Sequence, residues 1–192
     1  MNVFRRTLKK NNTVFLSYAI AIVMFIFVSI LRPEFASGAH IKIMLIDAAV
    51  LATLALGQTF AILMGGIDLS IQWNMCAAGM MITMLYKSWG CTSADLFWMI
   101  PMVLIITTVI GLINGFGISY LGINPMIMTF GMNTIIQGLV VGLSSRTLPG
   151  GYAPKVLENF CLGSTLGIPN MVLLWILIIA VASIVLAYTP YG

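Results

Sequence analysis

Six long apolar runs alternate with short polar stretches along this chain. Each run is close to the ~20 residues that an α-helix needs to cross the ~30 Å hydrocarbon core of a bilayer. The runs, and therefore the predicted transmembrane helices, cover residues 14–31, 43–64, 70–86, 96–120, 125–143 and 171–188. The pattern predicts an all-α polytopic membrane protein, built as a single membrane domain over residues 1–192.

The polar segments between these runs predict the connections. Residues 32–42 and 87–95 are short and polar, and each is expected to turn the chain. Residues 144–169 form the longest polar segment and are rich in glycine and proline, which is typical of a loop outside the membrane. Within that loop, residues 155–160 are expected to form a short amphipathic piece.

A polar break at residues 64–70 separates the second and third apolar runs. It contains the glycine pair Gly65 and Gly66, followed by Asp68 and Ser70. Lipid penalises each unpaired backbone group by several kcal/mol, so non-helical backbone at membrane depth is buried in protein or lines a water-filled cavity. The break is therefore expected to lie inside the protein.

Two interpretations of Asp68 and Ser70 stay open in the sequence. Either side chain could cap the following helix by accepting its first amide hydrogens, where a carboxylate is also stabilised by the helix dipole. Alternatively, the two residues form part of a gate or substrate pathway that faces Asn74 on the next helix.

A polar stripe is predicted on the fifth helix, where Thr129, Asn133 and Gln137 recur at every fourth position. Residues four apart project from the same side of a helix. The stripe could form interhelical hydrogen bonds, which contribute only about 0.6 kcal/mol each on average in membranes. It could instead form a polar wall of a substrate path.

The composition places the chain in a membrane, because 60% of its residues are hydrophobic and 7% are charged. Soluble domains average about 25% charged residues. The net charge of +4 comes largely from Arg5, Arg6, Lys9 and Lys10, which predicts a cytoplasmic N-terminus. No basic residues interleave with aromatic ones, so nucleic acid is not an expected partner. The first apolar run is longer than the 7–15 residues of a signal peptide, which favours a retained anchor.

Metal and catalytic chemistry find little support in the sequence. Cys76, Cys91 and Cys161 have no metal-binding spacing with one another or with His40, and neither zinc nor haem is expected. On the predicted topology Cys91 and Cys161 share the outer side, where a disulfide can form, but the sequence gives no distance between them.

An aspartate pair would be needed for one kind of intramembrane hydrolase, and Asp47 and Asp68 are the available candidates. The 21 residues between them approach the ~30 Å length of a full span, which places the two at opposite ends of one helix. Asp47 is then either a functional intramembrane acid or a solvated group at headgroup depth. No catalytic residue is assigned.

Three motifs in this order and spacing carry a family resemblance: AILMGGIDLS at residues 61–70, GLING at 111–115 and NPMIMTFGMN at 124–133. They resemble the membrane permease subunit of bacterial ATP-binding cassette (ABC) importers for monosaccharides, of the ribose, xylose and galactose type. The resemblance extends from the first predicted helix to Gly192 and corresponds to the N-terminal two thirds of a family member. The chain departs from it at Ile71, Gln72 and Trp73, where the family usually has a small residue and a glycine.

The resemblance implies an incomplete ABC-permease bundle in the bacterial inner membrane that passes a monosaccharide inward. Its implied partners are a second permease subunit, as a homodimer or heterodimer, cytoplasmic ATPase subunits, a periplasmic sugar-binding protein and membrane lipid. ATP hydrolysis is expected on a separate chain, because the phosphate-binding pattern GxxxxGK[ST] is absent, and no cofactor is expected. The predicted pathway or gating residues are Gly65, Gly66, Asp68, Ser70, Asn74, Thr129, Asn133 and Gln137.

Three alternatives are kept. A permease for branched-chain amino acids belongs to a related group, but few ionisable residues are placed to pair with a zwitterion. The chain could also be a truncated, non-functional membrane fragment. A membrane-embedded enzyme or assembly factor is the alternative from a different class, and the sequence favours it least.

Overall fold

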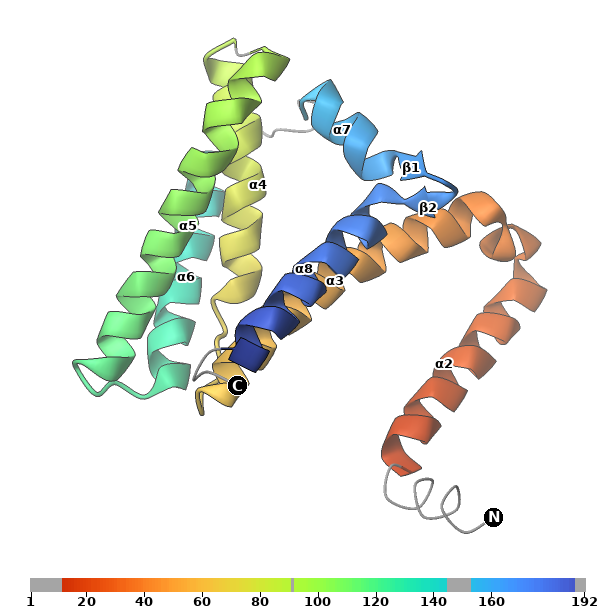
Figure 1. The fold of residues 1–192 in the computed structure, drawn as a ribbon, viewed down its shortest axis with the longest axis horizontal. Helices are drawn as coiled ribbons and strands as arrows, with labels where there is room; N and C mark the ends of the chain where they lie inside the picture. Colours follow the sequence, from red (N-terminus) through yellow and green to blue (C-terminus); the bar gives the residue numbers. More distant parts are fainter. Residues whose placement is uncertain (1–11, 91, 145–152, 189–192) are drawn as a thin grey trace. The chain divides into compact units, whose positions relative to one another are not determined.

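The computed structural model describes residues 12–90, 92–144 and 153–188 (Figure 1). These residues are almost entirely helical, which confirms the all-α class. The elements in chain order are α2 (Asn12–Leu31), η1 (Pro33–Ala36), α3 (Gly38–Leu63), α4 (Ile71–Ser88), η2 (Ser93–Asp95), α5 (Leu96–Ser119), α6 (Pro125–Ser144), α7 (Lys155–Leu162), β1 (Ser164–Thr165), β2 (Ile168–Pro169) and α8 (Asn170–Tyr188).

Four segments of the described chain are long and apolar enough to cross a membrane. They are Gly38–Leu63, Ser93–Ser119, Pro125–Ser144 and Asn170–Tyr188. The apolar part of α2, Phe15–Leu31, is shorter, and α4 is less apolar because it carries Gln72, Asn74 and Lys87. The exposed side chains of these helices are mostly large and apolar, as expected for surfaces that face lipid. The chain is therefore a multi-pass membrane protein.

By its internal contacts the chain divides into two compact units, Met1–Leu45 and Ile46–Gly192. In the first unit the ring of Phe35 packs against Phe25 and His40, with centroid distances of 5.6 and 4.7 Å. Ser37 ends the short connection, because its hydroxyl oxygen accepts the amide hydrogen of His40 at 3.3 Å. A serine in this position is a favourable helix cap.

The start of α3 corrects a sequence prediction. The helix begins at Gly38, so the prediction that residues 38–42 belong to a connection was wrong. The cap at Ser37 explains the earlier start. Asp47 is exposed and lies well inside the helix rather than near its first turn.

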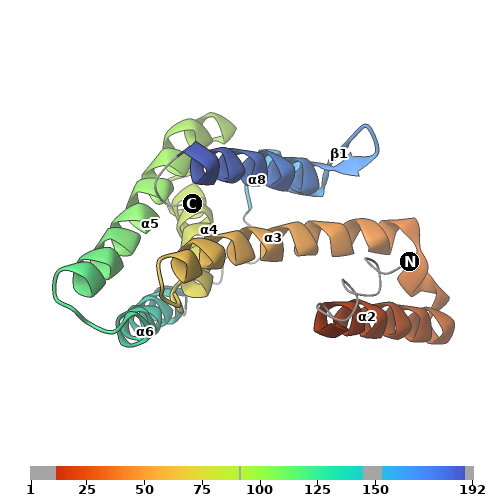
Figure 2. The ribbon, with the colours of Figure 1, turned by 60° about the horizontal axis from the view of Figure 1, so that its bottom comes forward.

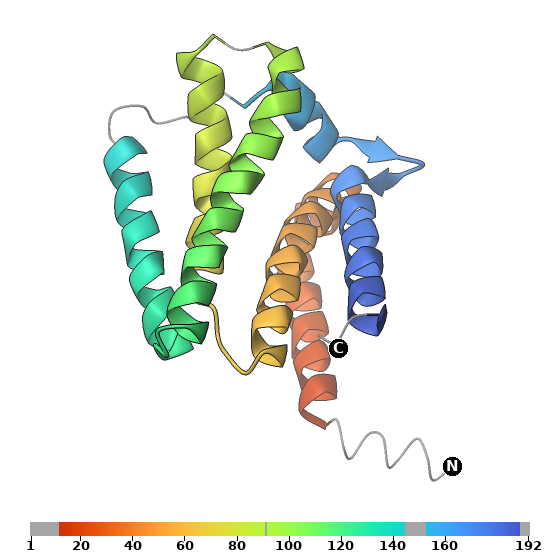
Figure 3. The same ribbon diagram turned by 60° about the vertical axis from the view of Figure 1, so that its left-hand side comes forward.

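The second unit has its core where α4, α5 and α6 pack side by side (Figures 1 and 3). Each helix contributes buried side chains to this core, the small Ala77 from α4, Met99 and Val103 from α5, and Thr129 and Ile136 from α6. Small residues let membrane helices approach closely, which favours van der Waals packing. The predicted bounds of these three helices differ from the observed ones by two residues at most.

The start of α6 is as predicted. Pro125 is its first residue, where a missing amide hydrogen costs nothing. The side chain of Asn124 accepts the amide hydrogen of Met126 through Oδ1 at 2.9 Å and so caps the helix.

Between α6 and α8, the described part of the chain forms α7 and a short hairpin. The hairpin consists of the two-residue strands β1 and β2 and leads into α8 (Figure 2). The expected amphipathic piece is confirmed by α7. Asn170 connects these elements, because its amide donates to the carbonyl oxygen of Phe160 at 3.0 Å and accepts from the hydroxyl of Thr165 at 2.7 Å.

Cys161 lies on α7 as a free thiol, and partial burial raises its pKa above the ordinary value. Cys91 lies outside the described residues, so a disulfide between the two stays untested.

Candidate functional site at the polar break

The break begins with a tight reversal at the end of α3. Gly65 has φ +81°, a left-handed conformation that costs an ordinary L-residue roughly 1–2 kcal/mol. Its amide donates to the carbonyl oxygen of Ile62, and the amide of Gly66 donates to that of Ala61, both at 2.9 Å. This Schellman pair satisfies two carbonyl groups that the end of a helix would otherwise leave unpaired.

Gly66 places the break against the start of α6. A Cβ atom at this position would lie 3.1 Å from Cβ of Pro125, which is closer than normal packing allows. A larger residue would therefore have to displace either the break or the first turn of α6. The two glycines thus have separate roles, one in the backbone conformation and one in a close approach.

Asp68 organises the entry into α4. Its Oδ1 atom accepts two hydrogen bonds from Ser70, at 2.8 Å from the amide nitrogen and 2.7 Å from the hydroxyl oxygen. The capping prediction was therefore wrong, because no side chain in the described part of the chain accepts an amide hydrogen from the first turn of α4 itself. Asp68 accepts the last amide hydrogen before the helix, whereas the side chain of Ser70 caps nothing in α4.

Ser70 also connects the break to α5. Its hydroxyl donates to Asp68 and accepts from Nδ2 of Asn114 at 2.9 Å. Both residues are almost fully buried, with 2% of Ser70 and 4% of Asn114 exposed, so water cannot easily replace this bond. The sequence prediction missed Asn114, although an asparagine inside the apolar run of α5 is itself a signal for a buried polar contact.

Thr129 holds the backbone of the break from α6. It is 1% exposed, and its hydroxyl oxygen accepts the amide hydrogen of Leu69 at 3.1 Å. The same oxygen lies 2.8 Å from the carbonyl oxygen of Pro125 and 3.2 Å from that of Ile67. One of these two carbonyls takes its hydrogen.

Asn74 is half-buried on α4 and joins that helix to α5. Its Nδ2 atom donates to the carbonyl oxygen of Thr107 at a long 3.4 Å. Its Oδ1 atom is buried and has no partner among the described residues.

The three polar residues of the predicted stripe on α6 differ in burial. Thr129 and Asn133 are buried, whereas Gln137 is exposed. Each residue turns an α-helix by about 100°, so positions spaced by four drift by about 40° per step and Gln137 points about 80° from Thr129. Ile136, seven residues after Thr129, deviates by only about 20° and takes the buried position, with 3% exposed.

Gly111 and Gly115 have the small-xxx-small spacing that is typical of close helix crossings in membranes. No neighbouring atom, however, lies within 4 Å of a Cβ built at either position. Instead, both border a cavity of about 350 Å³ between α3, α5 and the break. Asn114, on the same helix, makes the contact with the break.

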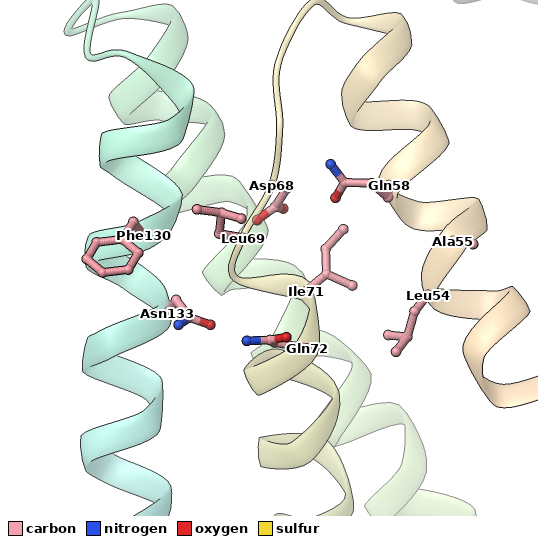
Figure 4. Close-up of a pocket in the computed structure, with 9 residues that line it drawn as sticks. All are labelled: Leu54, Ala55, Gln58, Asp68, Leu69, Ile71, Gln72, Phe130 and Asn133. Carbon is pink, nitrogen blue, oxygen red and sulfur yellow. The ribbon is translucent and has the colours of Figure 1, made fainter. Parts of the chain in front are cut away.

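A larger cavity of about 390 Å³ lies on another side of the break, between α3, α4 and α6 (Figure 4). Asp68 borders both cavities, whereas Asn133 borders only the larger one. Of the predicted pathway residues, the structure therefore brings together Gly65, Gly66, Asp68, Ser70, Asn74, Thr129 and Asn133 around the break, and it leaves out Gln137.

Within residues 12–90, 92–144 and 153–188, no three metal-binding side chains come together. The helix α3 is continuous to Leu63, so Asp47 is about 24 Å from the end that leads to Asp68, at ~1.5 Å per residue. An aspartate dyad is therefore excluded. The site is a polar cluster between apolar helices, and among the described residues that line its two cavities Asp68 supplies the single carboxylate.

These features define a multi-pass membrane protein with a polar, non-helical break between packed helices, as in transport proteins. Residues 40–192 match the family described as the permease component of branched-chain amino acid transport systems, and the chain belongs to that family.

Several relatives of this chain have sugar-transport names. The ribose import permease protein RbsC of Haemophilus influenzae is 29% identical over 92% of this chain and 54% of its own length. The D-allose transport system permease protein AlsC of Escherichia coli is 30% identical over 79% of this chain and 45% of its own length. The ribose import permease protein RbsC of Bacillus subtilis is 30% identical over 88% of this chain and 52% of its own length.

The chain therefore spans about half the length of these relatives. No solved structure matches it.

We predict that Thr129→Val destabilises the protein by about 1–3 kcal/mol, because it leaves the partly buried amide of Leu69 without an acceptor. Thr134→Val is the matched control. Thr134 is exposed on the same helix and bonds only to the carbonyl of Phe130, so its change should cost less than about 0.5 kcal/mol. Thermal unfolding of the detergent-solubilised variants measures both, and equal losses would contradict the assigned role of Thr129.

Proposed function

We propose that this chain acts in the permease component of an ATP-driven importer that passes a monosaccharide into the cytoplasm. The observation that carries the proposal is the break at residues 64–70, where a single carboxylate and several uncharged hydrogen-bonding groups meet beside a cavity of about 390 Å³. Relatives that match most of the chain are named as permeases for ribose and D-allose, which supports a sugar as the substrate.

A branched-chain amino acid is the second candidate, because the family description names this substrate class. A zwitterion needs both a cationic and an anionic partner in a dry site, since burying an unpaired charge is costly. Among the described residues that line the two cavities beside the break, Asp68 is the only ionisable one. A neutral sugar therefore fits the site better.

The residues of the break have different roles in this proposal. Gly65 and Gly66 set the path of the backbone, and Ser70, Asn74 and Thr129 hold the neighbouring helices against it. Alternating access would require the hydrogen bonds of Ser70, Asn74 and Thr129 to break and re-form one after another. Asp68 and Asn133 border the larger cavity and form the part of the pathway that the substrate meets.

The proposed assembly contains a second permease subunit, cytoplasmic ATPase subunits and a periplasmic sugar-binding protein in the bacterial inner membrane. The single membrane domain over residues 1–192 is part of the same proposal. The chain itself supplies no phosphate-binding loop, so the energy for transport would come from the ATPase partners. Co-purification of this chain with an ATPase subunit would test this coupling directly.

We predict a cytoplasmic N-terminus, with residues 144–169 outside the cytoplasm, because four cationic side chains precede the first helix. Alkaline phosphatase is active only after export. Fused after Gly163 it should be active, and fused after Gly122, in the turn between α5 and α6, it should be inactive. The reverse pattern of activity would show that the topology is opposite to the predicted one.

Deletion of the gene for this chain should lower the uptake of one radiolabelled monosaccharide, with D-ribose, D-allose and D-xylose as the probes. The wild-type gene should restore that uptake, and L-leucine uptake should not change. Loss of leucine uptake instead would favour the amino-acid alternative. No change in any uptake would favour a non-functional fragment.

Asp68 variants separate a structural from a gating role. Asp68→Ala removes the acceptor of two hydrogen bonds to Ser70, each worth roughly 1.5–3 kcal/mol when it involves a charged group. We expect less of this variant in the membrane fraction on an immunoblot. Asp68→Asn keeps an oxygen acceptor and should accumulate normally. Normal accumulation of Asp68→Ala without uptake would contradict the structural role and identify a gate.

A further inference from the structure

The larger cavity is lined by amide side chains that take no part in holding the break together. Gln58 comes from α3, Gln72 from the first turn of α4 and Asn133 from α6. In Figure 4 the amides of Gln72 and Asn133 point toward one another across the space between their helices, and that of Gln58 points toward Asp68. Three separate elements thus direct the same functional group into one space.

These amides have unused hydrogen-bonding capacity. Asn133 is only 9% exposed, and its Oδ1 atom is buried without a partner in the described part of the chain. A buried polar atom in that state costs about 1–3 kcal/mol unless something pairs with it. Over the same residues, the side-chain amides of Gln58 and Gln72 make no hydrogen bond within the protein. The cavity can therefore bind a ligand that carries hydrogen-bonding groups of its own.

The chemistry of the lining indicates the kind of guest. Each primary amide offers two donors and one acceptor oxygen, which suits hydroxyl groups because a hydroxyl both donates and accepts. Apart from the carboxylate of Asp68, the remaining lining is apolar and includes Leu54, Leu69 and Phe130, and no lysine or arginine among the described residues borders the space. The volume of about 390 Å³ falls within the ~300–1,000 Å³ of small-molecule pockets.

We propose that this cavity is a subsite for the hydroxyl groups of a neutral monosaccharide, and that Gln58 and Gln72 determine which sugar passes. The inference rests on the proposed function for its ligand class. It adds two residues that lie outside the polar network of Ser70, Asn114 and Thr129. Because neither glutamine supports that network, both can be replaced without disturbing the break.

Gln58→Met and Gln72→Met test selectivity, since methionine keeps the length of the side chain and removes the amide. Each should change the relative uptake of D-ribose, D-allose and D-xylose by roughly 2- to 10-fold, the value of one hydrogen bond. Gln137→Met is the matched control, because Gln137 is exposed on α6 and borders no part of this cavity. Unchanged ratios in both cavity variants would overturn the inference while leaving sugar import intact.

A second experiment does not depend on transport. Gln72→Cys is placed in a background where Cys76, Cys91 and Cys161 are serine, and membrane vesicles are treated with a polar methanethiosulfonate reagent. We expect labelling that at least one of the three sugars slows and L-leucine does not. Ser164→Cys, exposed on the hairpin, is the reactivity control.

The outcomes separate the two proposals. Absence of labelling at position 72 while position 164 reacts, or labelling that no sugar slows, would overturn the subsite. Protection by a sugar in a chain whose deletion changes no uptake would support the subsite and overturn the proposed function.

Discussion

Backbone hydrogen bonding is the constraint on which the rest of this structure depends, because hydrocarbon offers no partner to an unpaired amide or carbonyl group. Residues 64–70 leave the helical pattern, and the surrounding helices are arranged to satisfy what they expose. The reversal at Gly65 pairs the end of α3 with itself. Thr129 accepts the amide hydrogen of Leu69, which fixes α6 against the break. Asp68 accepts the amide hydrogen of Ser70, and Asn114 donates to the hydroxyl of Ser70, which fixes α5 there as well.

The helices could be predicted because long apolar runs in a membrane have few alternatives to the α-helix. The ends were predictable where a local signal exists, as at Pro125, whose first-turn preference and neighbouring Asn124 determine the start of α6. The start of α3 was not predicted correctly because residues 38–42 are polar and resemble a connection, although the serine cap at position 37 allows the helix to begin before them.

The candidate site was predictable only in part, because residue spacing reports direction along one helix but not which neighbour lies there. Thr129 was expected on a polar face, yet its bond to the backbone of Leu69 depends on packing between α6 and the break. Gln137 followed the same spacing and rotates out of the interface. Gln58 and Gln72 stand in no pattern with one another, and only the fold brings them to one cavity. Gln72 also lies where the chain departs from the motif that it otherwise resembles.

The bonds between Thr129 and the break have a consequence for the order of membrane insertion. They join residues that are 60 and 62 positions apart in the chain, and synthesis at ~5–20 residues per second would separate their appearance by roughly 3–12 s. During that interval the amide of Leu69 exists without the hydroxyl oxygen that later accepts its hydrogen. The nascent hairpin of α3 and α4 therefore has to keep its turn in contact with water, or with the insertion machinery, until α6 arrives.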